Sequence, residues 1–265
     1  MRDYCDYLNP ALELAIAAGR EILRFYDSGY AVEVKADHTP VTEADVAAHH
    51  LIVAGLKALD ATIPILSEEA DESVTVAVRQ QWPRFWLVDP LDGTREFIQH
   101  TGEFTVNIAL VEAGRPLLGI VYAPVLGCYY YACRGHGAYK REGTGEPQRI
   151  FVRDCDPHHV VVACGHSSCS LQLQQLFDNL PGYEVISLGS ALKSCLVAEG
   201  GADLYARFGP TSEWDTAAAQ CIVEEAGGQI TNMKMQPLRY NLNPTLLNPH
   251  FLVSGRSPFH WPDLF

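Results

Sequence analysis

The stretch FWLVDPLDGTREF, from Phe85 to Phe97, governs how the rest of the chain is interpreted. Its aromatic and apolar beginning, Phe85 to Val88, predicts a short buried strand. The Pro, Asp and Gly residues that follow are typical of a tight turn. Asp89 and Asp92 are therefore expected together at the end of a strand, with Pro90 stiffening the link between them.

After Gly93 the chain is expected to begin a helix, whose first backbone N–H groups have no partner within the helix. Such helix starts bind anions, and phosphate above all. Carboxylates beside a phosphate repel it unless cations lie between them. Mg²⁺ suits an oxygen-rich site that phosphate oxygens complete. The stretch therefore predicts metal-assisted phosphate chemistry.

Three other interpretations of these residues compete with that one. A calcium-binding loop needs acidic residues two positions apart, whereas Asp89 and Asp92 are three apart. A phosphatase that forms an aspartyl phosphate has D-x-D before Gly-Thr, and Pro90 occupies the place of its first Asp. An ordinary acidic turn is the commoner meaning of Pro, Asp and Gly alone. The partner residues elsewhere in the chain favour a functional site over a simple turn.

Length and charge limit the classes of function. A chain of 265 residues can bury a core as one large domain or two smaller ones. Its formal net charge of −13, without any long basic run, excludes a protein that binds the nucleic-acid backbone. A small nucleotide remains possible as a substrate, because it needs only local positive charge and a metal.

The cysteines predict a reducing environment with free, buried thiols. No two of them form a C-x-x-C pair, and no Cys and His spacing matches a zinc site. The sequence shows no apolar signal peptide and no apolar span near the ~20 residues that a membrane helix needs. These features favour a cytoplasmic protein. The eight cysteines are Cys5, Cys128, Cys133, Cys155, Cys164, Cys169, Cys195 and Cys221.

Two further carboxylates lie where predicted elements begin or end. Thr42 and Asp45 predict a capping box at the start of a helix that continues to about Leu59. Asp45 then either caps this helix or projects inward to orient a nucleophile. The short strand Ile63–Leu66 is followed by Ser67, Glu68 and Glu69, and we expect Glu68 to be the metal ligand.

The pattern of elements changes near residue 155. Apolar runs such as Phe104–Val111 and Leu117–Tyr122 predict an antiparallel sheet in the first part. After Asp154–Pro157, strands and helices alternate, which predicts a smaller α/β domain. We therefore expect domains at residues 1–155 and 156–265. Asp215 begins an apolar helix, Ala217–Ala226, either as its N-cap or as a metal ligand.

The motif Asp89-Pro90-Leu91-Asp92-Gly93-Thr94, with Glu68 upstream and Trp214-Asp215 downstream, resembles the lithium-sensitive, Mg²⁺-dependent phosphatases of the inositol monophosphatase superfamily. Within it the chain looks most similar to 3′(2′),5′-bisphosphate nucleotidases of the CysQ type. The resemblance covers nearly the whole chain. It implies an α/β (α+β) fold, a layered αβαβα sandwich. The closer match is carried by Lys35–Asp37, Pro40–Thr42, Leu66–Glu69, Arg95–Phe97, Gly102–Leu110 and the run from Gly189 to Asp215.

The resemblance also implies a set of metal ligands and a catalytic pair. Two or three Mg²⁺ ions would be held by Glu68, Asp89, the backbone carbonyl of Leu91, Asp92 and Asp215. The backbone N–H groups of Gly93 and Thr94 would hold the scissile phosphate. The Thr94 hydroxyl, oriented by Asp45, would position and help deprotonate the attacking water, so that no covalent intermediate is needed.

The resemblance also implies that four residues of the second part select the substrate: His166, Ser190, Lys193 and Arg207. Lys193 and Arg207 have the right chemistry for a phosphate that is not hydrolysed, although a surface Lys, a surface ion pair and a loop His are the plain alternatives. The chain departs from the family at Ala163-Cys164-Gly165-His166, where Ser-Arg-Ser-His is usual. The implied substrate contacts in full are Glu68, Leu91, Asp92, Gly93, Thr94, His166, Ser190, Lys193, Arg207 and Asp215.

The implied activity is hydrolysis of the 3′-phosphate of adenosine 3′,5′-bisphosphate to AMP and phosphate, with 3′-phosphoadenylyl sulfate as a second substrate, in sulfur assimilation. An inositol or sugar phosphate phosphatase on the same metal site is the enzymatic alternative. A non-catalytic regulator that binds Mg²⁺ or a nucleotide is the other. Monomer and homodimer both stay open, as does peripheral association with the cytoplasmic face of the inner membrane.

Overall fold

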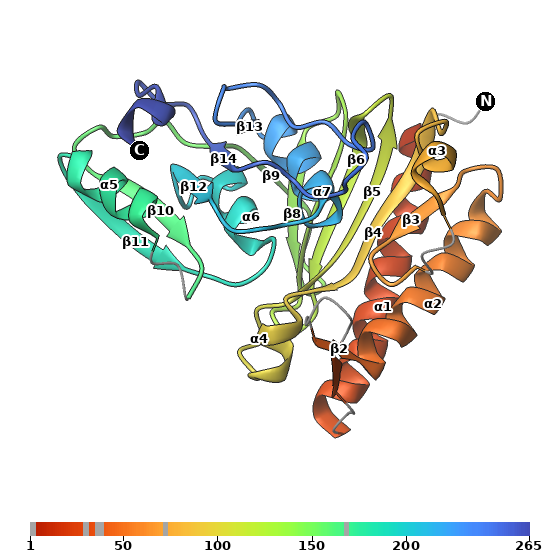
Figure 1. The fold of residues 1–265 in the computed structure, drawn as a ribbon. Coiled ribbons are helices and arrows are strands. Elements are labelled where there is room, and N and C mark those ends of the chain that lie inside the picture. Colours follow the sequence, from red (N-terminus) through yellow and green to blue (C-terminus); the bar gives the residue numbers. More distant parts are fainter. Residues whose placement is uncertain (1–3, 29–31, 35–39, 71–73, 167–169) are drawn as a thin grey trace.

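Two β-sheets and three groups of helices stack in five layers (Figure 1). This computed structural model describes residues 4–28, 32–34, 40–70, 74–166 and 170–265. Lys35–Asp37 and Cys169, which the sequence analysis names, lie outside the described residues. Helices α1 and α2 cover one face of a large sheet, α6 and α7 lie between the two sheets, and α5 covers the outer face of the small sheet.

The large sheet has seven strands in the order β3-β4-β5-β6-β7-β8-β9. Only β3 and β4 are parallel, and every other neighbouring pair is antiparallel. Because β3 and β4 are parallel, their C-terminal ends lie side by side at the same end of the sheet. The strands are β3 (Ile65–Ser67), β4 (Arg84–Asp92), β5 (Thr105–Glu112), β6 (Arg115–Ala123), β7 (Cys128–Cys133), β8 (Ala138–Glu142) and β9 (Gln148–Ile150).

The small sheet has five strands in the order β11-β10-β12-β14-β13. Strands β10, β11 and β12 are parallel, and β14 runs antiparallel to both β12 and β13. A separate pair, β1 (Val32–Val34) and β2 (Pro40–Thr42), is antiparallel. The strands of the small sheet are β10 (Val160–Cys164), β11 (Tyr183–Ser187), β12 (Leu204–Arg207), β13 (Gln229–Asn232) and β14 (Phe251–Ser254).

The helices differ widely in length and position. The longest, α1 and α2, are antiparallel neighbours on the outer face of the large sheet. The helices are η1 (Tyr4–Tyr7), α1 (Leu8–Ser28), α2 (Glu43–Leu59), α3 (Val76–Arg79), α4 (Thr94–Ile98), α5 (Leu171–Asn179), α6 (Leu192–Ala198), α7 (Glu213–Glu225) and η2 (Trp261–Leu264).

Alternation along the strands creates three separate cores. In β4, Trp86 and Val88 face α1 and α2, whereas Phe85 and Leu87 face the helices between the sheets. In β10, Val162 points to the outer core under α5, while its neighbours point to the middle core. Successive side chains of a strand point to opposite faces, so both sheets are buried on both sides. The layered αβαβα sandwich expected from the sequence is confirmed.

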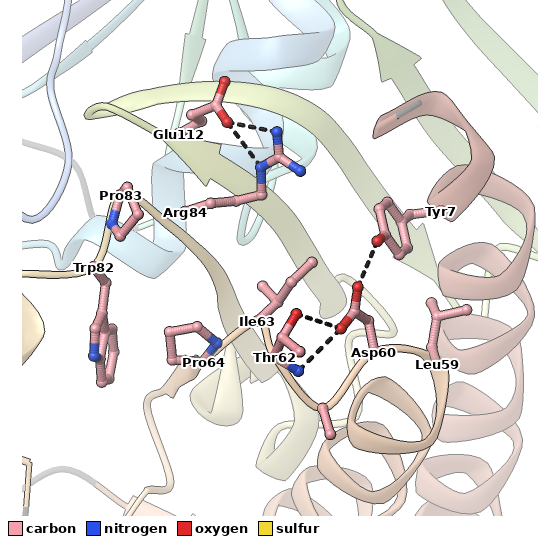
Figure 2. A pocket seen from close by; sticks show the side chains of 11 residues that line it. Tyr7, Leu59, Asp60, Thr62, Ile63, Pro64, Trp82, Pro83, Arg84 and Glu112 are labelled. Carbon is pink, nitrogen blue, oxygen red and sulfur yellow. Dashed lines mark hydrogen bonds and ion pairs between the residues drawn. The ribbon is translucent and has the colours of Figure 1, made fainter. Parts of the chain in front are cut away.

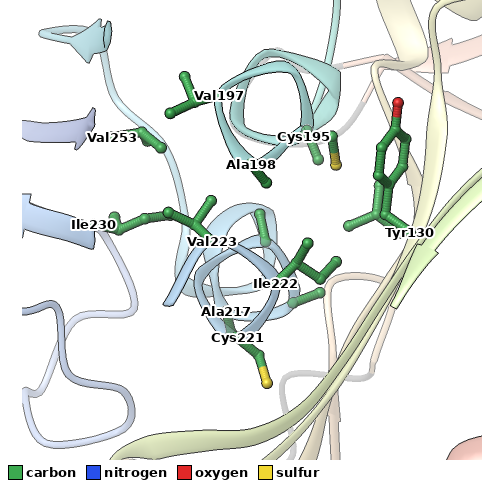
Figure 3. Packing of buried hydrophobic residues seen from close by; sticks show 14 of the residues in the cluster. Tyr130, Cys195, Val197, Ala198, Ala217, Cys221, Ile222, Val223, Ile230 and Val253 are labelled. Carbon is green, nitrogen blue, oxygen red and sulfur yellow. The ribbon is translucent and has the colours of Figure 1, made fainter. Parts of the chain in front are cut away.

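The middle layer is built from small side chains, which lets α7 lie close to the large sheet. Figure 3 shows Ala217, Cys221 and Ile222 of α7 between the sheet residue Tyr130 and the small sheet. Gly119 of β6 has no side chain where the Ala218 carbonyl approaches, and a Cβ there would collide with that oxygen. This close packing fixes the position of α7 against β6, and hence against the sheet that contains β4 and its acidic motif.

The two sheets fall on either side of the expected boundary at residue 155, and the middle core contains residues from both parts. The division into 1–155 and 156–265 therefore stays a prediction. Strands β8 and β13 were not expected from the sequence. Both carry mixed polar residues, because β8 lies near the edge of its sheet and β13 forms an edge.

Strand β4 is longer than the apolar run Phe85–Val88 indicates. Pairing with β5 continues past Asp89, shifts register at Pro90 and Leu91, and resumes where Asp92 lies opposite Thr105. Such an irregularity lets a strand re-aim its side chains without ending. Asp89 and Asp92 therefore both belong to the strand, whereas the sequence placed them after it.

The expectation of eight free thiols is wrong for Cys5 and Cys133, which form a disulfide across 128 positions. Helix η1 packs at the end of the large sheet, where the Tyr4 hydroxyl donates to the Arg134 carbonyl oxygen at 3.1 Å. This contact brings Cys5 to Cys133, and no local spacing could indicate it. Among the cysteines that the structure describes, those that are free and buried are Cys128, Cys155, Cys164, Cys195 and Cys221.

Loss of this disulfide should destabilise the fold. Cys5→Ser should lower the free energy of unfolding by about 2–4 kcal/mol, because a long closed loop restricts the unfolded chain. Urea unfolding of the oxidised proteins measures the difference. With dithiothreitol present, wild type and variant should unfold together. Equal stability without reductant would show that the bond does not form.

Candidate active site

Three carboxylates meet where the two sheets adjoin. Oxygens of Asp89, Asp92 and Asp215 all lie within 4.8 Å of one another. Asp89 is 1% exposed, and the other two side chains are half-buried by surface area. Three acidic groups at this separation offer hard oxygen ligands for a divalent cation. The described part of the chain therefore has a carboxylate cluster that fits Mg²⁺.

The irregular end of β4 aims two of these side chains. The backbone N–H of Leu91 donates to Asp89 Oδ1 at 3.1 Å, while the Leu91 side chain is buried against α1 and α2. Gly93 has a φ of +93°, a left-handed conformation that glycine adopts without strain. A Cβ on Gly93 would lie 3.2 Å from that of Ser190. The turn into α4 therefore needs glycine at this position.

The third carboxylate comes from the first turn of α7. Ser212, not Asp215, is the N-cap of this helix, and Asp215 is the third helical residue of a capping box. The Ser212 N–H donates to Asp215 Oδ2 at 3.0 Å. The N-cap alternative for Asp215 is thus wrong, because the helix begins at Glu213, four positions before the expected Ala217. Asp215 has one oxygen held by the helix start while its carboxylate remains in the cluster.

Crowding makes the cluster costly without a cation. Burial raises the pKa of Asp89 well above its usual range, and the charges of Glu68, Asp92 and Asp215 add to the effect. Burial, followed by repulsion from Asp92, likewise raises the pKa of Asp215. Burial also raises the pKa of Asp92, although Lys193 and the Asn107 amide oppose the rise. A divalent cation would offset this repulsion.

Glu68 and Leu91 lie at the border of the cluster. Glu68 follows β3, and its negative charge acts on both Asp89 and Asp215, so the parallel β3–β4 pair brings it close. It is not among the three residues whose oxygens converge within 4.8 Å. The Leu91 carbonyl oxygen lies 3.4 Å from Thr94 Oγ1, as an alternative acceptor for the Thr94 hydroxyl proton. Their roles as ligands stay predictions.

Asp45 and Thr94 are joined although they are 49 positions apart. Thr94 Oγ1 donates to Asp45 Oδ1 at 3.2 Å. The second oxygen of Asp45 accepts from the Thr42 backbone N–H at 2.7 Å and from the Thr42 hydroxyl, which completes the capping box of α2. The capping alternative for Asp45 is confirmed, and its other carboxylate oxygen contacts Thr94, while its role in orienting a nucleophile stays a prediction.

Two polar residues of β5 were given no role by the sequence. The Asn107 amide donates to Asp92 Oδ2 at 3.2 Å, and Thr105 Oγ1 lies 3.2 Å from Ser190 Oγ. Both side chains are buried, and Asn107 pairs in register with Asp89. Polar residues on one face of an otherwise apolar strand were the available signal.

Two cationic side chains lie beside the acidic cluster. Lys193 is 6% exposed, and its Nζ donates to the Ser190 carbonyl at 2.7 Å. Burial lowers the pKa of Lys193, Arg207 acts in the same direction, and Asp92 opposes both. Within the described residues, Arg207 Nε is buried without an acceptor, and neither cation has an ion-pair partner. The pair therefore fits an anion.

His166 lies near this pair, and its side chain contacts Glu103, which belongs to the first part of the chain. Its Nε2 is 2.5 Å from Glu103 Oε2, which also accepts from the Gly189 N–H at 2.7 Å. The parallel strands β10 and β12 end at the same edge, so His166 and Arg207 emerge together. Glu103 was missed by the sequence analysis and connects the two parts of the chain here.

A surface pocket lies elsewhere on the molecule. A pocket of about 900 Å³ lies at the start of β4, the end opposite the acidic cluster. Figure 2 shows its polar side chains bonded to one another, with Arg84 on Glu112 and Tyr7 on Asp60. Because these groups are mutually satisfied, the pocket offers no converging chemistry. The site is therefore identified by its side chains and not by volume.

Comparison with known proteins agrees with this geometry. The sequence model of the inositol monophosphatase family matches residues 3–258. The chain belongs to the inositol monophosphatase family. The family is metal-dependent, in keeping with the acidic cluster.

Individual members of the family narrow the comparison. The 3′(2′),5′-bisphosphate nucleotidase CysQ of Escherichia coli (strain K12) is 47% identical over 249 residues, which cover 93% of this chain and 99% of that protein. The structure of CysQ from Bacteroides thetaiotaomicron has a TM-score of 0.80 at 39% identity, covering 93% of this chain and 96% of that one. An inositol monophosphatase from Zymomonas mobilis has a TM-score of 0.77 at 27% identity, covering 100% and 98%.

The acidic cluster predicts how stability responds to Mg²⁺ and pH. Mg²⁺ at 100 times its dissociation constant should add about 2.7 kcal/mol to the free energy of unfolding. Without metal, stability should fall as pH rises above about 4, because the raised pKa values mean that the folded state retains protons which the unfolded chain releases. Differential scanning calorimetry with EDTA and with Mg²⁺ measures both effects.

Asp89→Asn removes one of the repelling charges. The metal-free variant should be at least as stable as wild type at pH 8 and should lose most of the Mg²⁺ response. Asp178→Asn, which changes an exposed carboxylate on α5, is the matched control and should behave as wild type. An unchanged Mg²⁺ response in Asp89→Asn would contradict the assignment of the site.

Proposed function

We propose that this chain is a Mg²⁺-dependent 3′(2′),5′-bisphosphate nucleotidase. It would hydrolyse the 3′-phosphate of adenosine 3′,5′-bisphosphate to AMP and phosphate, and would also accept 3′-phosphoadenylyl sulfate. The observation that carries the proposal is the pair of cations beside the acidic cluster: Lys193 is buried, and Arg207 is half-buried with a buried Nε that has no acceptor among the described residues. In a substrate with two phosphates, one phosphate would lie at the metal cluster and the other at the Lys193 and Arg207 pair. The CysQ name of the similar Escherichia coli protein supports the same assignment.

The proposed metal site consists of Glu68, Asp89, the Leu91 carbonyl, Asp92 and Asp215, holding two or three Mg²⁺ ions. When bound, Mg²⁺ lowers the pKa of a water molecule and neutralises the charge that develops in a phosphoryl displacement. Asn107 keeps Asp92 in position through its amide, and Thr105 Oγ1 lies 3.5 Å from Asp92 Oδ2. The buried environment strengthens these electrostatic effects by excluding water.

The catalytic pair would act on the attacking water. Asp45 holds the Thr94 hydroxyl, so that its oxygen is free to accept a proton from the water while its own proton is directed toward the carboxylate. The Gly93 and Thr94 N–H groups would bind the oxygens of the scissile phosphate. Since water attacks directly, no covalent phosphoenzyme forms.

Lys193 and Arg207 would bind the second phosphate, with Ser190 and His166 on the nucleoside side. Arg207 would give its unused Nε–H to a phosphate oxygen, and charge-assisted bonds of this kind are the strong ones. Cys164 stands where the family usually has Arg, and its buried thiol lies near Lys193. This departure removes one cation, so the second phosphate would depend more on the remaining two.

We propose a cytoplasmic location, because the substrate would be a nucleotide metabolite. The free thiols expected from the sequence no longer support this location, because Cys5 and Cys133 form a disulfide. None of the described helices is both long and apolar enough to cross a membrane.

A substrate panel separates the nucleotidase from an inositol or sugar phosphatase. With Mg²⁺, kcat/KM should be highest for adenosine 3′,5′-bisphosphate, compared with inositol 1-phosphate, fructose 1,6-bisphosphate and AMP. Lys193→Met and Arg207→Met should each raise KM for the bisphosphate roughly 10- to 100-fold, since a hydrogen bond to a charged group contributes about 1.5–3 kcal/mol.

The monophosphates serve as internal controls, because their KM should change little in either variant. Preference for inositol 1-phosphate would keep the metal site and overturn the substrate assignment. Release of phosphate from none of the four compounds would favour a regulator that only binds Mg²⁺ or a nucleotide.

Removal of the Thr94 hydroxyl tests the catalytic pair. Thr94→Val should lower kcat about 10²- to 10⁴-fold, the usual contribution of a positioned proton acceptor, with little effect on the Mg²⁺ requirement. Thr94→Ser should retain most activity. Thr101→Val, a nearby exposed threonine, is the matched control. Normal kcat in Thr94→Val would remove Thr94 from the mechanism.

A further inference from the structure

One buried arginine lies outside the acidic cluster and is not used by the mechanism above. Arg79 ends α3, in the connection between β3 and β4, and its side chain is 3% exposed. Burying a guanidinium is costly unless its donors are satisfied. The partners of Arg79 therefore indicate why it is there.

All three of its side-chain partners belong to one irregular segment, residues 241–244, more than 160 positions away. Nη1 donates to Asn241 Oδ1 at 2.6 Å, and Nη2 donates to the carbonyls of Asn243 at 3.0 Å and Pro244 at 2.5 Å. The Asn241 amide donates back to the Arg79 carbonyl at 2.6 Å. The fork of the guanidinium thus fixes both the side chain and the backbone of this segment.

The same segment and its continuation to residue 248 hold the first turn of α7. The Asn241 N–H donates to Glu213 Oε2 at 2.7 Å, and the Glu213 N–H donates to the Leu246 carbonyl at 2.8 Å. The Asn248 amide donates to the Ser212 carbonyl at 2.6 Å and to Thr216 Oγ1 at 3.1 Å. The helix residues in these bonds, 212, 213 and 216, surround Asp215.

We propose that Arg79 is a positioning residue for Asp215 and hence for the metal site. It connects the chain between Glu68 and Asp89 to the segment that fixes the start of α7. The two strand-borne carboxylates and the helix-borne one lie on separate elements, so their separation depends on such a connection. Arg79 supplies it through residues 241–244, which turn three oxygen acceptors toward the buried guanidinium.

The proposal rests on the metal site of the proposed function but not on the choice of substrate. Its test is therefore the Mg²⁺ dissociation constant of the substrate-free protein, measured by isothermal titration calorimetry. Arg79→Met should weaken Mg²⁺ binding about 10- to 100-fold, the usual effect of removing a group that orients a metal ligand. At saturating Mg²⁺, KM for the bisphosphate should stay within about twofold of wild type, because the Lys193 and Arg207 pair is unchanged.

Two further variants show whether the path through residue 241 matters. Asn241→Ala should weaken Mg²⁺ binding in the same direction as Arg79→Met. Arg79→Lys keeps the charge but has no planar fork, so its constant should lie between wild type and Arg79→Met. If Arg79→Met does not fold, these two variants carry the test with the same measurement.

Arg153→Met is the control for a loss of stability alone. Arg153 forms a bidentate pair with the buried Asp203, and its neighbour Val152 donates its N–H to the carbonyl of Ala226, at the opposite end of α7 from Asp215. This variant should lower the melting temperature and leave the Mg²⁺ constant unchanged. An unchanged Mg²⁺ constant in Arg79→Lys and Asn241→Ala, with a melting temperature lowered as in Arg153→Met, would overturn the proposal. A failed substrate panel would leave this test unaffected.

Discussion

Mutual repulsion among buried carboxylates is the constraint on which the active site depends. Asp89, Asp92 and Asp215 have oxygens within 4.8 Å of one another, and burial raises the pKa of each, with repulsion from neighbouring carboxylates adding to the rise at Asp89 and Asp215. A folded chain tolerates such a cluster only if packing elsewhere keeps it together. A bound divalent cation offsets the repulsion among the carboxylates, so the cluster favours the metal-bound state of the protein.

Rigid elements supply the packing that holds these charges together. Strand β4 is covered on both faces, and its irregular end turns Asp89 and Asp92 toward α7 without ending the strand. Helix α7 fits tightly against the large sheet because Gly119 leaves room for its backbone. The segment after β13 then surrounds the helix start. The carboxylates on the strand and on the helix are thus held at fixed positions relative to one another, which loops alone would not achieve.

Two positively charged side chains lie beside the acidic cluster. Lys193 is buried in α6, and Arg207 is half-buried at the end of β12. Glu103, on the other part of the chain, bonds both His166 and Gly189. An anionic substrate would therefore be held between two parts that each contribute half of the required groups. The acidic overall charge of the chain gives no hint of this local pair.

The sequence by itself determined the acidic motif and the helix start at Thr42, because each depends on neighbouring residues. The layered fold and the pairing of Asp45 with Thr94 followed from the sequence only through the family resemblance. Tertiary structure decided the rest: the shift of register inside β4, Asp215 as the third residue of α7, the Cys5–Cys133 bond and the Arg79 connection. These features join residues far apart in the chain, and no local pattern of hydrophobicity or turn chemistry records which distant groups a packed core will bring into contact.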